Sequence, residues 1–335
     1  MSAPPAKYEL EQPWLPVSEG IADWGPDFHD LMLGDRLRMA AFRTAIREAV
    51  RPGHVVLDLG TGTGILALWS LEAGAARAYG LDVSATVLAT AAQRLDAAGH
   101  GERFVPVHGM SYTVELPERV DLIISETLGN LVDNESCVSI LADARTRFLK
   151  PGGVLLPRRA QSYLAPVAAE RAHAAVLAGA VQGGDASRIG RWATYYDAVV
   201  PWSAHLAGPR LLRDYGFTAA DQDEYDVELT FPVARGGALT GFKGWFVADL
   251  SATVALDISG DDIGGGGSSD SWKHCYLPIE HPVRVRPGDR VTVTVSRRSL
   301  LAGESFGQRY RWVGAVRRGA EVMARFDHVS GPAAD

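Results

Sequence analysis

The sequence predicts an α/β protein in which a doubly wound parallel sheet is followed by an antiparallel, β-barrel-like domain with a helical arm. Three observations carry this prediction. The chain has 335 residues, enough for about two domains. Signals for buried strands and for helices alternate up to residue 157. Beyond that residue, short stretches alternate apolar and polar side chains between Gly- and Pro-rich turns.

The same change of pattern predicts the domain boundaries. Residues 1–24 contain several prolines and read as an extension. Residues 25–157 form the predicted parallel-sheet domain, and residues 158–335 form the second domain. We place the helical arm near residues 200–220 of that second domain.

The first domain opens with one or two amphipathic helices within residues 28–50, and Pro52–Gly53 ends them. Residues 55–59 then predict a buried strand. The elements that follow alternate between helices at 65–73, 84–98 and 135–148 and strands at 78–81, 104–108, 120–125 and 154–157. Strands separated by helices of this length predict parallel βαβ units.

The second domain shows four segments with strand periodicity, at 225–232, 241–258, 275–279 and 290–296. Residues 171–215 look helical and irregular, which suggests an arm or insertion. Residues 261–270 (DDIGGGGSSD) predict a flexible loop.

Composition excludes several classes of protein. Hydrophobic residues make up 47% of the chain, and 33 Lys and Arg against 40 Asp and Glu give a net charge of −7. That balance offers no general field for nucleic acid, so we expect no nucleic-acid partner. No run of 18 apolar residues and no signal-peptide pattern is visible, so we expect no membrane partner. Two cysteines indicate a reducing, cytoplasmic location, and the scattered histidines predict no metal site.

A glycine-rich loop after the first strand is the strongest local signal. It reads Asp58-Leu-Gly60-Thr61-Gly62-Thr-Gly, and Asp82 follows the second strand. Such glycines let the backbone approach a ligand closely, and a carboxylate after strand two can accept both hydroxyls of a ribose. The dinucleotide fingerprint requires a further glycine where Ile65 stands. The arrangement instead resembles class I S-adenosylmethionine (AdoMet) methyltransferases; an ordinary βα turn with a surface Asp is the alternative.

Two glutamates follow the fourth strand, at the edge where open α/β sheets bind ligands. Glu126 and Glu135 flank a loop that contains Gly129 and ends in Ser136. Its pattern, S-E-x-x-G-x-x-x-x-x-E-S, closely resembles the double-glutamate loop of protein arginine methyltransferases. The alternative is an unremarkable loop carboxylate next to a helix N-terminal carboxylate.

The chemistry of a guanidinium agrees with this resemblance. A guanidinium stays charged, with a pKa of about 13.8, so removing its proton before reaction is impractical. Two carboxylates can hold its nitrogens through charge-assisted hydrogen bonds and draw positive charge from the attacking nitrogen. The sulfonium of AdoMet supplies the leaving group, so the protein provides mainly proximity and electrostatics.

The resemblance covers roughly residues 25–300 and implies further roles. It assigns catalysis to Glu126 and Glu135, and substrate contact to Met32, Ser271 and Trp272. It assigns AdoMet binding to Arg38, Asp58, Gly60, Thr61, Gly62, Asp82, Ser111, Tyr112 and Glu126. It also implies a homodimer whose helical arm docks on the partner's cofactor domain, with residues 206–217 as the best match to that arm.

The sequence departs from the family at the predicted substrate mouth. The aromatic signature before the first helix is absent, and Trp24 stands in that region. The family's Thr-His-Trp loop reads Asp270-Ser271-Trp272, so Asp35 loses the histidine with which it would pair. His274 lies nearby in sequence and more often would be a solvated loop residue than a replacement. Tyr112 takes the place of the glutamate that contacts adenine.

Three functions remain open at this point. The first is AdoMet-dependent N-methylation of an arginine guanidinium in free L-arginine, a peptide or a protein, and the Arg- and Ala-rich composition suggests a bacterial member acting on free arginine or a small guanidine. The second is methylation of another small acceptor. The third is an inactive scaffold homologue, against which the retained polar residues argue. Cys137, where the family often has Met, changes the room near the acceptor, and the sequence does not decide between mono- and dimethylation.

Overall fold

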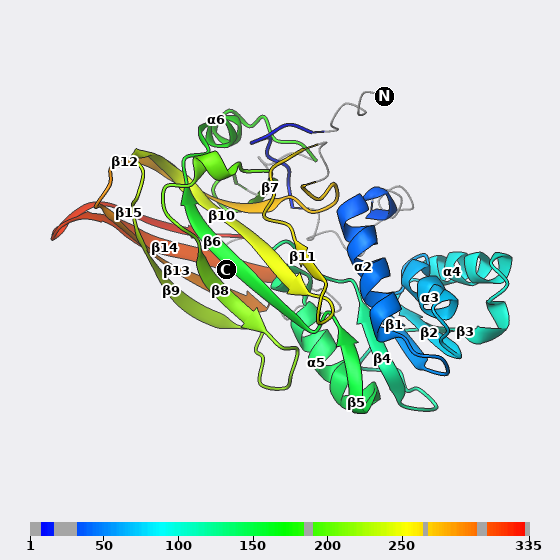
Figure 1. Ribbon diagram of the computed structural model, residues 1–335. Helices are drawn as coiled ribbons and strands as arrows, with labels where there is room; N and C mark the ends of the chain where they lie inside the picture. Colours follow the sequence, from blue (N-terminus) through cyan, green and yellow to red (C-terminus); the bar gives the residue numbers. More distant parts are fainter. Residues whose placement is uncertain (1–7, 17–31, 184–189, 264–266, 300–306, 332–335) are drawn as a thin grey trace.

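The computed structural model describes residues 8–16, 32–183, 190–263, 267–299 and 307–331. The molecule is elongated, with a parallel sheet and its helices at one end and antiparallel strands at the other (Figure 1). The α/β fold class predicted from the sequence is confirmed.

The first domain is built on a five-stranded parallel sheet with strand order β3-β2-β1-β4-β5. Its strands are β1 (Val55–Leu59), β2 (Arg77–Asp82), β3 (Phe104–His108), β4 (Val120–Ser125) and β5 (Leu149–Leu156). Successive strands are added on one side of β1 up to β3, and on its other side from β4 onward. The carboxyl ends of β1 and β4 therefore bound the crevice where such sheets bind ligands.

The helices of this domain are α2 (Arg36–Ala49), α3 (Ile65–Glu72), α4 (Ala85–Ala97) and α5 (Cys137–Phe148). Short 3₁₀ turns lie at η2 (Gly101–Arg103) and η3 (Asp133–Glu135). Ser84 caps α4, as predicted, because its hydroxyl accepts from the amide of Val87. The predicted start of the third helix at Glu135 is wrong: Ser136 adopts a left-handed conformation, which separates the turn holding Glu135 from α5.

The second domain contains two antiparallel sheets. One has the order β7-β12-β10-β6-β8, with β11 beside β10, and the other has the order β15-β14-β13-β9. The first sheet comprises β6 (Arg159–Val167), β7 (Tyr196–Ala198), β8 (Arg210–Tyr215), β10 (Gly237–Asp249), β11 (Ala255–Asp257) and β12 (His274–Val285). The second comprises β9 (Tyr225–Pro232), β13 (Arg290–Ser299), β14 (Gln308–Arg318) and β15 (Glu321–Val329).

These sheets face each other across a core that includes Phe231, Phe242 and Trp312. Contacts between β8 and β9 and between β12 and β15 close the arrangement on two sides, which makes it barrel-like. A second core is shared by the two domains, because Trp245 and Trp272 belong to the same cluster as residues of the parallel sheet.

The predicted helical arm is not a helix. Among the described residues 171–183 and 190–215, the only α-helix is α6 (Glu170–Ala178), and it is followed by β7, the 3₁₀ turn η5 (Trp202–Ala204) and β8. Residues 206–217 contain β8, which pairs with β6 from Ala160 to Leu164. The edge strand β6 offers unpaired backbone N–H and C=O groups to this segment. Pairing with them outweighs any local preference for a helix. The predicted strand 241–258 is two strands, β10 and β11, joined by a turn.

The described part of the N-terminal extension lies on the second domain. Trp14 pairs with Asp197 of β7, with both amides donating to the opposite carbonyl at 2.9–3.0 Å. No helix among residues 8–16, 32–183, 190–263, 267–299 and 307–331 is long and apolar enough to cross a membrane. In the same ranges, no three His, Cys, Asp or Glu side chains are grouped to hold a metal ion.

Candidate active site

The glycine-rich loop turns sharply after β1. Gly60 and Gly62 have φ values of 72° and 53°, in the left-handed region that favours glycine. A Cβ at Gly60 would lie 2.9 Å from the methyl group of Thr127, so the close packing also requires glycine there. The amides of Gly60 and Thr61 both donate to the carbonyl of Leu81, which ties the loop to the end of β2.

Asp58, at the end of β1, holds this loop through hydrogen bonds. Its carboxylate is fully buried and accepts from the Thr61 hydroxyl at 2.7 Å and from the Ala67 amide at 2.9 Å. Burial raises the pKa of Asp58 to about 7, although these two hydrogen bonds act in the opposite direction. The other carboxylate oxygen, Oδ1, has no hydrogen-bond partner in the described part of the chain. Such an orphaned buried acceptor fits a site that a ligand completes.

Asp82 lies at the end of β2, facing the loop. One oxygen accepts from the amide of Gly62 and the other from the amide of Ser84, each at 2.9 Å. The carboxylate is thereby held in one orientation while it remains partly exposed. A carboxylate oxygen has further lone pairs, so Asp82 can still accept from the two hydroxyls of a ribose.

Ser111 and Tyr112 follow β3 at the same edge of the sheet. Ser111 is buried, and its carbonyl accepts from Arg147 of α5 at 2.7 Å. Tyr112 is 48% exposed. The structure therefore places both residues along the predicted cofactor edge, with Tyr112 facing solvent.

The two predicted catalytic glutamates are not equivalent. The Glu126 carboxylate forms a buried ion pair with the guanidinium of Arg38, whose plane also lies over the indole of Trp272, 4.8 Å from the ring centroid. Burial lowers the pKa of Arg38 to about 10, so it is charged at neutral pH. Its Nε atom is buried and has no hydrogen-bond partner in the ranges that the structure describes.

Glu135 lies at the end of η3, where the positive charge of Arg38 affects its pKa. Burial raises the pKa of Glu135 to about 7; Arg38 lowers this pKa, and the carboxylate of Asp197 raises it further. The Asp197 carboxylate itself accepts from the side-chain Nδ2 of Asn130 at 2.7 Å, so the second domain contacts the loop between the glutamates. Glu126 thus pairs directly with Arg38, and the positive charge of Arg38 also acts on Glu135.

Asp35 has a new set of partners in place of the missing histidine. One oxygen caps α2 by accepting from the Arg38 amide at 3.1 Å. The other accepts from the Ser269 hydroxyl, and from the Ser271 hydroxyl and amide at 2.7 and 3.0 Å. The indole of Trp272 donates to the carbonyl of Leu128 at 2.7 Å. The loop holding Trp272 is therefore fixed to both α2 and the glutamate loop.

His274 neither replaces the lost histidine nor faces solvent as predicted. It is 1% exposed at the start of β12, where its Nδ1 accepts from the amide of Val200 at 2.9 Å and its Nε2 lies 3.0 Å from the carbonyl of Ile258. Burial lowers the pKa of His274 well below its usual value. A neutral, buried imidazole cannot pair with Asp35.

Three other residues, Met32, Trp24 and Cys137, were also expected near the substrate. Met32 is half-buried just before α2, and its substrate contact stays a prediction. Trp24 lies outside the described residues. Cys137 is buried, its thiol donates to the carbonyl of Val132 at 3.0 Å, and burial raises the pKa of the thiol well above its usual value.

Sequence reasoning missed two contributors to the site. Asp197 lies in a three-residue strand more than sixty positions from the glutamates, and no local pattern points to it. Ser269 had a weak signal, the run of Ser and Asp before Trp272. A hollow of about 650 Å³ lies elsewhere, lined by residues of α2, β5 and the β10–β11 turn, and includes none of the predicted site residues.

Comparison with known proteins adds two family matches. Residues 56–153 match the methyltransferase domain model, and residues 159–306 match the PRMT5 oligomerisation domain model. Probable protein arginine N-methyltransferase 6 of Arabidopsis thaliana is 30% identical over 287 residues, covering 81% of this chain and 65% of that protein. Protein arginine N-methyltransferase PRMT10 of the same plant is 43% identical over 139 residues, covering 41% and 36%. The chain thus spans less than two thirds of the length of these curated relatives.

Two solved structures share the fold at 22% identity. Arabidopsis thaliana protein arginine methyltransferase 10, described in a uniquely open conformation, superposes with a TM-score of 0.75 and covers 90% of this chain and 97% of that one. The Trypanosoma brucei PRMT1 enzyme–prozyme heterotetramer with AdoHcy gives 0.76, with coverage of 90% and 96%. The chain is therefore similar to a methyltransferase domain and to the PRMT5 oligomerisation domain over consecutive segments, and part of its sequence resembles protein arginine N-methyltransferases, whose fold it shares.

Proposed function

We propose that this protein transfers a methyl group from AdoMet to a guanidinium nitrogen of arginine. The observation that carries the proposal is the pair of carboxylates in one loop: Glu126 forms an ion pair with the Arg38 guanidinium, and the charge of Arg38 also acts on Glu135. A loop that binds one guanidinium through a carboxylate next to an indole ring, with a second carboxylate near the same cation, has the chemistry to bind the guanidinium of a substrate.

The residues present fit AdoMet. Asp82 would bind the ribose hydroxyls, the Gly60–Gly62 turn would let the ligand approach the backbone, and Arg38 would bind the carboxylate of the methionine part. The buried Asp58 Oδ1 and Arg38 Nε atoms lack partners in the described residues, as expected of a site completed by a ligand. When bound, AdoMet supplies the electrophilic methyl group on its sulfonium.

The glutamates would orient the acceptor and take up its proton. As the N–C bond forms, the attacking nitrogen must lose one proton. A carboxylate with a pKa near 7 accepts a proton more readily than an ordinary glutamate, and Glu135 has that property. Glu126, which pairs with Arg38, would bind the remaining guanidinium nitrogens of the acceptor.

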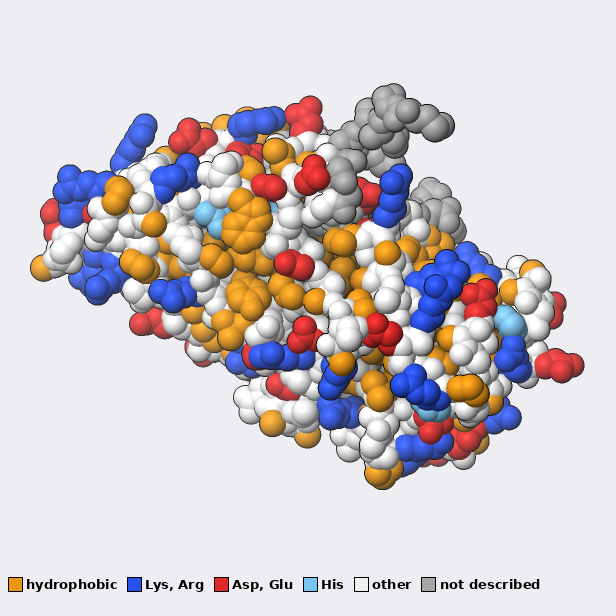
Figure 2. All heavy atoms as spheres, viewed as in Figure 1, with side chains coloured by type: hydrophobic (Ala, Val, Ile, Leu, Met, Phe, Trp, Pro, Cys, Tyr) orange, Lys and Arg blue, Asp and Glu red, His pale blue; other side chains and the backbone are white. Residues whose placement is uncertain are grey.

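Within this function, we propose free L-arginine, or an arginine in a short peptide or protein, as the acceptor, and a bacterial source for the enzyme. We also propose that the protein is a homodimer. Hydrophobic side chains gather on the outer face of the sheet that contains β6, β8 and β10 (Figure 2). Trp202 and Leu211 are each 43% exposed there, within the segment that matches an oligomerisation domain. Molar mass by light scattering of wild type and Trp202→Ser would test this state.

One experiment separates the possible functions. The purified chain is incubated with AdoMet carrying a labelled methyl group and, in parallel, with free L-arginine, an Arg-Gly peptide, a guanidine-free amine, or no acceptor. Label on either arginine acceptor, and none on the amine, supports the proposal. Label only on the amine favours a different small-molecule methyltransferase. No transfer, with AdoMet binding intact, favours a scaffold homologue.

A further inference from the structure

A third carboxylate of the glutamate loop, Asp133, is buried against the antiparallel domain. Asp133 lies in η3, two residues before Glu135, and has no exposed surface. It accepts from the hydroxyl of Tyr215 at 2.7 Å and from the hydroxyl of Tyr310 at 2.5 Å. Neither tyrosine belongs to the parallel-sheet domain: one is on β8 and the other on β14.

A buried arginine offsets the charge of this carboxylate. Arg297 of β13 has no exposed surface, and its Nε lies 4.0 Å from Asp133 Oδ1. The same guanidinium donates to the carbonyl of Asp223 at 2.8 Å. A charge in such surroundings is tolerated only where partners compensate it, so the group specifies one position for the carboxylate.

The turn held by Asp133 has an unfavourable backbone. Val132 on one side has φ 74° and ψ −60°, and Ser136 on the other has φ 55° and ψ 22°. Side chains with a Cβ, and β-branched ones above all, rarely adopt positive φ. Such conformations persist only where surrounding contacts over-determine them, and they cluster at functional sites. The contacts of Asp133 lie between these two residues.

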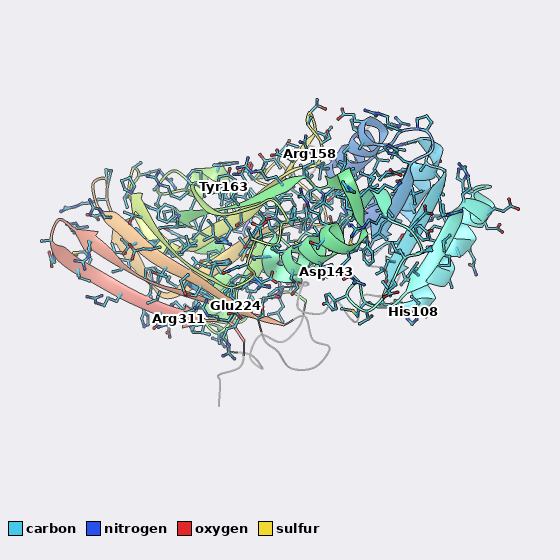
Figure 3. All side chains as sticks on the ribbon, turned by 90° about the horizontal axis from the view of Figure 1, so that it is seen from below. His108, Asp143, Arg158, Tyr163, Glu224 and Arg311 are labelled. Atoms are coloured by element: carbon cyan, nitrogen blue, oxygen red, sulfur yellow. The ribbon has the colours of Figure 1, made fainter. Side chains whose placement is uncertain are left out.

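The turn η3 lies between the two domains, which lets the contacts of Asp133 connect the glutamate loop to the antiparallel domain. Seen from below, α5, which begins just after the turn and holds Asp143, lies between the parallel sheet and the antiparallel strands near Glu224 (Figure 3). Leu131, on the other side of the turn, belongs to the core of the antiparallel domain. The loop therefore carries both glutamates, of which Glu126 pairs with Arg38, while Leu131 and Asp133 in its middle are buried against the second domain.

We propose that Asp133 is a positioning residue: its hydrogen bonds to Tyr215 and Tyr310 and its ion pair with Arg297 make the antiparallel domain set the position of Glu135. This inference rests on the proposed function for its catalytic consequence. The anchoring of the loop by Asp133 does not depend on that function, and it can be measured without an activity assay.

The test removes one hydroxyl at a time. Tyr215→Phe and Tyr310→Phe each delete a single donor to Asp133. The matched control is Tyr276→Phe, because Tyr276 is also fully buried and its hydroxyl donates to the backbone carbonyl of Thr240 at 2.9 Å, away from the glutamate loop. For each variant, kcat and KM for the arginine acceptor, the AdoMet dissociation constant and hydrogen exchange across residues 126–136 are measured.

We expect kcat to fall at least tenfold in Tyr215→Phe and Tyr310→Phe, with AdoMet affinity within twofold of wild type and faster exchange confined to residues 126–136. Tyr276→Phe should keep both kcat and loop exchange. The proposal is overturned if the two variants match this control, or if exchange rises uniformly over the whole chain, because the hydroxyls would then contribute only general stability.

Asp133→Asn provides a second route that keeps the shape of the side chain. It should reproduce the loop-specific exchange, and wild-type exchange in a folded Asp133→Asn protein would contradict the proposal. If wild type methylates no arginine acceptor, the proposed function fails, yet the exchange data still decide whether Asp133 anchors the loop.

Discussion

The guanidinium of Arg38 and the carboxylate of Glu126 form a buried ion pair across two elements, the first turn of α2 and the loop after β4. The resemblance to known methyltransferases assigns Arg38 to the cofactor and Glu126 mainly to the substrate. Under these proposed assignments, the ion pair links the cofactor site to the substrate site, so we expect a change at either residue to affect both binding events.

The glutamate pair gives the first prediction. Glu126→Gln and Glu135→Gln keep the side-chain shape but remove the charge that binds the guanidinium. Each should lower kcat by about 30- to 1000-fold, which corresponds to the loss of roughly 2–4 kcal/mol of transition-state stabilisation. The double variant should be little worse than either single one, since the two act as a unit. Steady-state rates with an arginine acceptor measure this, and a near-normal rate in either single variant would exclude the clamp.

The ion pair makes these two variants differ in cofactor binding. Glu126→Gln weakens the hold on Arg38, so AdoMet affinity should fall, whereas Glu135→Gln should bind AdoMet like wild type. Calorimetric titration with AdoMet distinguishes them. Equal affinities in both variants would show that the Arg38–Glu126 contact does not affect the cofactor.

Asp82 gives the prediction most specific to the cofactor. Asp82→Ala should weaken AdoMet binding by about 1.5–3 kcal/mol, the range for lost hydrogen bonds to a charged group. Glu102→Ala is the control, because Glu102 is an exposed carboxylate in η2, directly before β3 and therefore at the opposite edge of the sheet from Asp82. Unchanged AdoMet affinity in a folded Asp82→Ala protein would remove Asp82 from the cofactor site.

The partners of Asp35 give a stability prediction. Ser271→Ala removes one hydroxyl donor to a buried carboxylate and should lower the free energy of unfolding by about 0.5–1.5 kcal/mol. Asp35→Ala should cost more, because it also removes the N-cap of α2, worth about 1 kcal/mol. Ser139→Ala, at an exposed serine of α5, is the control. Urea unfolding of the four proteins would reveal the order, and equal midpoints would refute it.

The raised pKa of Glu135 predicts a pH dependence. The clamp requires the ionised carboxylate, so kcat/KM should fall as pH decreases through about 7. Asp197→Asn removes a negative charge that raises this pKa, so the acid limb should move to lower pH. Asp58 also has a pKa of about 7, but Asp197 is not among the groups that shift it. A pH–rate profile unchanged by Asp197→Asn would therefore assign the limb to a group other than Glu135.

The raised pKa of Glu135 affects stability in the opposite direction to activity: it favours the folded protein at low pH. The folded protein binds the Glu135 proton more tightly than the unfolded chain does, since the pKa is raised in the fold. The contribution of Glu135 to stability is therefore greatest at low pH and is lost as pH rises through about 7.

The sequence by itself determined the parallel-sheet domain and most of the cofactor edge. Strand β1, the glycines after it and Asp82 depend on local rules: an apolar run, positive φ, and a carboxylate at a strand end. The glutamate pair was also visible, because both residues and their spacing lie in one loop. Local chemistry written in consecutive residues can be recognised without knowing what packs against it.

Only the tertiary structure decided the remaining features, because they depend on contacts between distant residues. Residues 206–217 form a strand because a sheet edge is available for pairing, not because of their own preference. Asp35 meets Ser269 across more than two hundred positions, and Asp133 meets Tyr310 across 177. No periodicity encodes such pairs, since burial and charge compensation are properties of the assembled domains. The positions of Arg38 and Glu135 therefore follow from packing between the two domains.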